Sequence, residues 1–151
     1  MRGNGEREVA ELGARARLGR VQVIVRHGPR VDELLTRLST AERFADALAG
    51  VTATLVVAGH THQQDDRMVG DARFVNADSV GLPDEGDGAA RWLWVENGVP
   101  KLRRTAYDAV GAGRRMLAAR WPDEHSVGAA LIDPLEPIVV TRIFEERATA
   151  G

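Results

Sequence analysis

The chain has no cysteine among its 151 residues. Disulfides and thiolate metal sites are therefore excluded, and any bound metal must rest on His, Asp, Glu or Asn side chains. No uninterrupted apolar run approaches the ~20 residues of a membrane-spanning helix, and the amino terminus is too charged for a secretory signal. The net charge of -2 gives no general bias towards nucleic acid or membrane. These absences favour a cytoplasmic protein.

Length and composition are those of one globular domain. The chain is long enough to bury a sizeable core, and its hydrophobic fraction of 44% is ordinary. No internal repeat or low-complexity tract is evident. We therefore expect a single domain over residues 1–151.

Two histidines directly follow the clearest strand pattern in the chain. Residues 54–57 are short, apolar and rich in β-branched side chains, which predicts a buried strand. Gly59 then allows a sharp turn, and His60 and His62 come next, two residues apart. Imidazoles held rigidly at the end of a strand can bind metal. An isolated His-x-His also fits two ordinary loop histidines, so the surrounding sequence must decide.

Periodicity and turn signals divide the rest of the chain into short elements. Ser39 and Glu42 have the spacing of a capping box, which predicts a helix that ends at Gly50. Asn97-Gly98 is a strong hairpin signal. We predict helices over 6–17, 31–38, 109–121 and 138–147 with a short one after His125, and strands over 21–25, 67–69, 72–76, 91–96 and 101–107.

Several conspicuous side chains have ordinary structural interpretations. Asp65 and Asp66 precede a predicted strand and are expected in a solvated turn. Trp92 and Trp94 fall on one strand face, where core packing or sheet covering is favoured over ligand stacking. Arg30 could contact a phosphate, and a surface salt bridge explains it equally well. His125 is expected to be structural.

Four segments, in the correct order, resemble motifs of the calcineurin-like metallophosphoesterase superfamily, in particular its small bacterial phosphodiesterase and phosphatase branch. Gly59-His60-Thr61-His62 resembles the family's Gly-His-x-His motif, and residues 26–30 resemble its His-Gly-Ser-Pro-Arg segment. Asn4 lies in a block similar to a variant of Gly-Asn-His-Asp. Residues 74–83 resemble the Asn-Pro-Gly-Ser-Val-Gly stretch. From Arg2 onward the chain thus resembles the later part of such a domain.

The resemblance implies an α/β fold, a layered α/β/β/α sandwich, and a two-metal site. Asn4, His27 and His60 would bind the second metal, and His62 would complete the first. The metals would be divalent Mn, Fe or Zn, which suit mixed imidazole and oxygen ligands. They would activate water to hydrolyse a phosphomonoester or phosphodiester bond in a small molecule or a phosphoprotein.

The family's Asp-x-His and Gly-Asp-x-x-Asp motifs, which supply most ligands of the first metal and the bridging carboxylate, do not occur before Asn4. We therefore expect a domain truncated at its amino terminus, with reduced metal occupancy and impaired or lost activity. Missing opening strands would expose a sheet edge, which predicts low stability and association into a homo-oligomer. The alternative is a non-catalytic remnant that serves as a binding or oligomerisation module.

Overall fold

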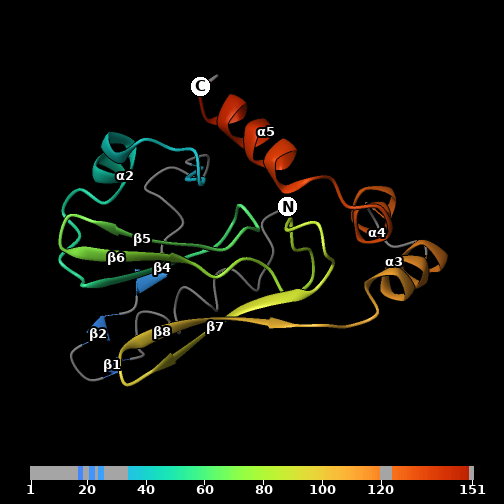
Figure 1. Ribbon diagram of the computed structural model, residues 1–151, viewed down its shortest axis with the longest axis horizontal. Coiled ribbons are helices and arrows are strands. Elements are labelled where there is room, and N and C mark those ends of the chain that lie inside the picture. Colours follow the sequence, from blue (N-terminus) through green and yellow to red (C-terminus); the bar gives the residue numbers. More distant parts are fainter. Residues whose placement is uncertain (1–16, 19–20, 23, 26–33, 120–123, 150–151) are drawn as a thin grey trace.

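The structure is a computed structural model that describes residues 17–18, 21–22, 24–25, 34–119 and 124–149. Among the described residues, three short strands, the helix α2 and five further strands come first, and three helices follow them (Figure 1). The elements are β1 (Arg17–Leu18), β2 (Val21–Gln22), β3 (Ile24–Val25), α2 (Ala41–Ala47), β4 (Leu55–Ala58), β5 (Asp65–Val69), β6 (Ala72–Asn76), β7 (Ala90–Glu96), β8 (Val99–Thr105), α3 (Ala109–Ala118), α4 (Glu124–Ile132) and α5 (Pro137–Thr149).

A four-stranded sheet of order β3-β4-β6-β5 forms the centre of the molecule. The strands β3, β4 and β6 are parallel, and β5 closes one edge as an antiparallel strand. Because β4 and β6 are in register from Leu55↔Arg73 to Ala58↔Asn76, both strands end at the same edge of the sheet. Open α/β sheets bind ligands at this carboxyl edge. The predicted α/β fold is confirmed.

The main core lies between α2 and this sheet. Phe44 of α2 packs against Val56 and Phe74, and all three side chains are at most 2% exposed. The rings of Phe44 and Phe74 meet edge to face, with centroids 5.0 Å apart. The guanidinium of Arg67 lies over the Phe44 ring at 4.3 Å from its centroid. In Figure 1, α2 lies above the sheet and the β7–β8 hairpin below it.

The amino-terminal side of α2 differs from the sequence prediction. Residues 34–38 are not helical, because the hydroxyls of Thr36 and Ser39 accept local backbone N–H groups that a helix would need. Thr40, and not Ser39, is the N-cap of α2, and its hydroxyl accepts from the Arg43 N–H. The helix therefore begins one residue later than a cap at Ser39 requires, and the Ser39 hydroxyl donates instead to Glu145.

The amino-terminal predictions are tested only in part. The predicted helix over 6–17 lies outside the described residues except for Arg17, which belongs to β1 and pairs with Gln22 of β2. The predicted strand over 21–25 is present at its described residues, but it is divided between two sheets. One part pairs with β1 and the other with β4.

Asp65 and Asp66 do not form a turn but begin β5. Asp65 pairs with Arg67 at 2.7 Å, and Asp66 accepts two hydrogen bonds from the guanidinium of Arg73. Pairing with β6 extends the strand two residues before its predicted start. Both carboxylates therefore support the sheet edge.

The β7–β8 hairpin turns at Asn97 and Gly98, as predicted, and both residues have positive φ. Trp92 and Trp94 share one face, also as predicted, and their rings meet edge to face. They are 37% and 49% exposed, however, so they do not belong to a core. The predicted helices over 109–121 and 138–147 correspond to α3 and α5, and the short one to α4. No helix among the described residues is long and apolar enough to cross a membrane.

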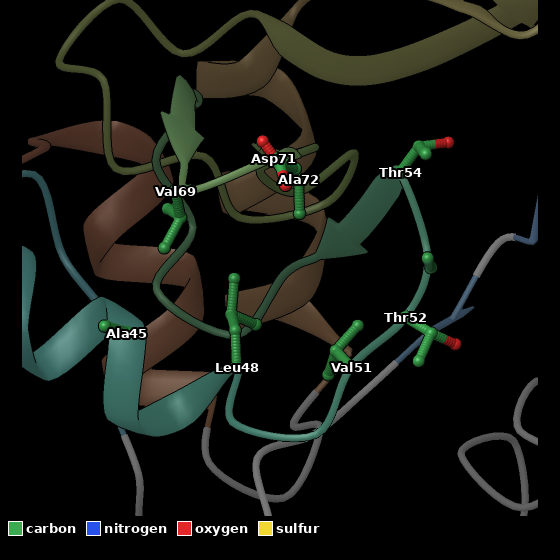
Figure 2. Close-up of a pocket in the computed structure, with 10 residues that line it drawn as sticks. Ala45, Leu48, Val51, Thr52, Thr54, Val69, Asp71 and Ala72 are labelled. Atoms are coloured by element: carbon green, nitrogen blue, oxygen red, sulfur yellow. The ribbon is translucent and has the colours of Figure 1, made fainter.

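A hollow of about 390 Å³ lies between the end of α2, the following loop and the β5–β6 turn (Figure 2). Its wall is mostly small and apolar, with Asp71 as its single carboxylate. The hollow lies at the amino ends of β4 and β6, whereas the histidines follow the carboxyl end of β4, so the two lie at opposite edges of the sheet. The lining residues are Ala45, Leu48, Val51, Thr52, Ala53, Thr54, Val69, Gly70, Asp71 and Ala72.

Candidate metal centre

His60 and His62 lie in the loop that leaves the carboxyl end of β4. His60 is exposed, His62 is half-buried, and Thr61 between them is buried at 3% exposure. The loop therefore inserts its central side chain into the protein and leaves both histidines at its surface. This is the predicted position at the ligand-binding edge of the sheet.

The histidines themselves make the turn. His60 has φ 76° and His62 has φ 48°, both in the left-handed region that non-glycine residues rarely adopt. Gly59, to which the sequence assigned the turn, does not have positive φ, and an added Cβ there would meet nothing closer than the Asp78 carbonyl at 4.0 Å. Backbone strain of this kind collects at functional sites and persists only where surrounding contacts enforce it.

Asn76, the last residue of β6, makes contacts that stabilise this strained backbone. Its amide nitrogen donates to the Gly59 carbonyl at 3.0 Å and to the Thr61 hydroxyl at 2.9 Å. Its amide oxygen accepts from the Asp78 N–H at 2.9 Å, and the side chain is 1% exposed. One buried amide thus ties the histidine loop to the loop after β6.

Asp84 lies beside His62. The Asp84 N–H donates to the His62 carbonyl at 2.8 Å, and the Asp84 Oδ2 is 3.9 Å from the His62 Nδ1. Burial lowers the pKa of His62, against a smaller opposing effect from its hydrogen bond with the Leu82 backbone. We therefore treat the 3.9 Å approach as a contact of a neutral imidazole, the form that binds metal, and not as an ion pair.

Two carboxyl groups near this loop, those of Asp84 and Asp78, lie in an environment that disfavours their negative charge. Burial, together with repulsion from the negative charge of Glu85, raises the pKa of Asp84 to about 6. Burial likewise raises the pKa of Asp78 to about 7, and one of its oxygens is buried without a hydrogen-bond partner among the described residues. A divalent cation nearby would reverse this effect by stabilising the carboxylates. The donor chemistry fits a divalent metal.

The four predicted metal ligands are not all tested. His60 and His62 are placed in one loop, while Asn4 and His27 lie outside the described residues. Within the part of the chain that the structure describes, no three His, Asp or Glu side chains are placed to hold one ion. The described residues therefore supply two imidazoles of a candidate centre.

Three residues of this site were not predicted: Asn76, Asp84 and Gln63, whose buried amide donates to the Asp84 carbonyl. Asn76 lies in the stretch that resembles Asn-Pro-Gly-Ser-Val-Gly, and that signal could have marked it. Asp84 and Gln63 depend on contacts between distant segments, and no local pattern marks them.

The sequence matches no family model and no curated protein. The solved structures that are similar in fold include the following two. A metallophosphoesterase from Sphaerobacter thermophilus has a TM-score of 0.55 at 18% identity, over 75% of this chain and 54% of its own. A hypothetical protein from Pyrococcus horikoshii OT3 has a TM-score of 0.56 at 19% identity, over 69% of this chain and 41% of its own.

This chain therefore spans about half the length of the structures that it matches. At this level of identity the likeness concerns the fold. The resemblance to the calcineurin-like metallophosphoesterases is confirmed at that level.

Proposed function

We propose that this protein is a metal-dependent phosphoesterase that hydrolyses phosphomonoester or phosphodiester bonds. One observation carries the proposal: in a chain with the fold of a metallophosphoesterase, two imidazoles follow β4 at the carboxyl edge of the sheet. Their positive φ angles and the buried Asn76 amide support a built site over two ordinary loop histidines.

His60, with Asn4 and His27, would bind one divalent Mn, Fe or Zn ion, and His62 would complete the site of another. When bound, such a metal supplies a Lewis acid for the phosphoryl oxygens and lowers the pKa of a bound water. Asn76 fixes the backbone between the histidines, and Asp84 lies against the imidazole of His62. The substrate would be a small phosphoester or a phosphoprotein.

The proposal is tested by hydrolysis of an aryl phosphomonoester and an aryl phosphodiester, with added Mn²⁺ or with chelator. His62→Ala and His60→Ala remove the candidate ligands. Asp71→Asn is the matched control, because Asp71 is an exposed residue at the opposite edge of the sheet. We expect each histidine variant to lose more than about 100-fold in activity, since even an outer partner of a ligand is worth about 10- to 100-fold.

Turnover that requires Mn²⁺ and both histidines, with Asp71→Asn unchanged, would support the phosphoesterase. Rates that respond neither to metal nor to the histidine variants would contradict it. That result would favour the second candidate, a binding or oligomerisation module. The exposed pair Trp92 and Trp94 on the β7–β8 hairpin is the observation in favour of that module.

A further inference from the structure

Gln63, the residue directly after His62, is the most deeply buried polar side chain of the histidine loop. It is 2% exposed. Its amide nitrogen donates to the Asp84 carbonyl at 3.1 Å and to the Pro137 carbonyl at 2.8 Å. Its amide oxygen accepts from the Thr141 hydroxyl at 2.7 Å. The two carbonyls require donors, so this network fixes the orientation of the amide.

This amide joins three segments that are distant in the sequence. The histidine loop provides Gln63, the loop after β6 provides Asp84, and α5 provides Pro137 and Thr141. The Thr141 hydroxyl, 3% exposed, has one proton and two acceptors within reach, the Gln63 oxygen and the Pro137 carbonyl at 2.8 Å. In Figure 1, α5 lies above the loops at the carboxyl edge of the sheet.

A second polar contact holds α5 one turn further along. Glu145 accepts from the hydroxyls of Thr36 and Ser39, and it pairs with Arg43 at 3.1 Å. This contact ties α5 to the segment around the start of α2 and does not touch the histidine loop. Of these two polar attachments of α5 within the described residues, the one at Thr141 reaches the site.

We propose that Gln63 is a positioning residue for His62, and that α5 acts on the metal centre through the Thr141–Gln63 hydrogen bond. The inference rests on the proposed function, in which His62 is a metal ligand. Gln63 immediately follows His62, whose φ is 48°. The buried side-chain amide of Gln63 therefore holds the backbone directly after this left-handed residue. With the amide restrained by α5 and by the Asp84 carbonyl, the imidazole of His62 keeps one direction, beside the Asp84 carboxyl group.

The test uses the whole chain and three single variants. Thr141→Val removes the hydroxyl at nearly constant shape, and Thr141→Ser restores it. Glu145→Gln is the matched control, since it weakens the other attachment of α5. The two readouts are the imidazole ¹H–¹⁵N signals of His62 in the metal-free protein and the affinity for Zn²⁺ by calorimetry.

We expect Thr141→Val to move the His62 signals and to weaken Zn²⁺ binding about tenfold. Thr141→Ser should return both towards wild type, and Glu145→Gln should change neither. His62 signals that stay unchanged in Thr141→Val, or that move equally in Glu145→Gln, would overturn the inference. If the wild-type chain binds no Zn²⁺, the proposed function fails, while the imidazole signals still decide whether Gln63 positions His62.

Discussion

Removal of the Asn76 amide should release the histidine loop from the sheet. In Asn76→Ala the buried Thr61 hydroxyl and the Asp78 N–H each lose a hydrogen bond, and the Gly59 carbonyl keeps its bond from the Thr61 N–H but loses the one from Asn76. A net cost of about 0.5–1.5 kcal/mol for each hydrogen bond gives a loss of about 2–4 kcal/mol in the free energy of unfolding. At about 2–4 °C for each kcal/mol, the melting temperature should fall by about 5–15 °C.

The measurement is urea and thermal unfolding followed by circular dichroism, with Thr61→Val as the graded control. That variant removes one of the three contacts and keeps the shape of the side chain, so it should cost about 1 kcal/mol. The double variant should show a coupling energy of at least about 0.5 kcal/mol, because the two side chains bond directly. A loss below about 0.5 kcal/mol in Asn76→Ala would refute the assigned role of the amide.

Three further predictions concern the core, the turn and a buried acid. Phe44→Ala should lower the free energy of unfolding by about 3–5 kcal/mol, because it empties the contact with Val56 and Phe74; a cost below about 1 kcal/mol in urea unfolding would contradict the packing. Gly59→Ala should stay within about 0.5 kcal/mol of wild type, since its φ is not positive and an added Cβ meets nothing closer than 4.0 Å; a fall of about 2 kcal/mol would show that the turn depends on Gly59. The pKa of Asp78 is raised to about 7 by burial and by the charges of Glu85 and Asp84, against the Ser79 N–H and Arg91. Because the folded state holds this proton more tightly than the unfolded state, the free energy of unfolding should fall as pH rises from about 4 to about 7, and Asp78→Asn should reduce that fall. Urea unfolding at about pH 5 and about pH 8 measures the difference in stability between the two pH values. A difference that is the same in Asp78→Asn as in wild type would contradict the assignment.

The strand before the histidines could be predicted because its signal is local. Residues 54–57 are β-branched and apolar, and β4 forms there with the histidines at its end. The β7–β8 turn was predictable for the same reason, since Asn97 and Gly98 tolerate positive φ. The position of the histidine loop therefore followed from short-range chemistry.

The contacts that hold that loop were not predictable, because they depend on register and on distant segments. Asn76 reaches Gly59 only when Ala58 and Asn76 are paired across parallel strands. Gln63 meets Thr141 across 78 positions. The cap of α2 was displaced by one residue because the Ser39 hydroxyl is used by Thr36 and Glu145.

Crystals of the chain soaked with Mn²⁺ and measured at a wavelength where manganese scatters anomalously would test the central claim most directly. The account predicts anomalous peaks within about 2.0–2.3 Å of an imidazole nitrogen of His60 and of an imidazole nitrogen of His62, the range of metal–ligand bonds. The peak beside residue 62 should disappear in His62→Ala, and both peaks should persist in Asp71→Asn. Ordered imidazoles without an anomalous peak beside them would contradict the claim that this loop is a metal centre.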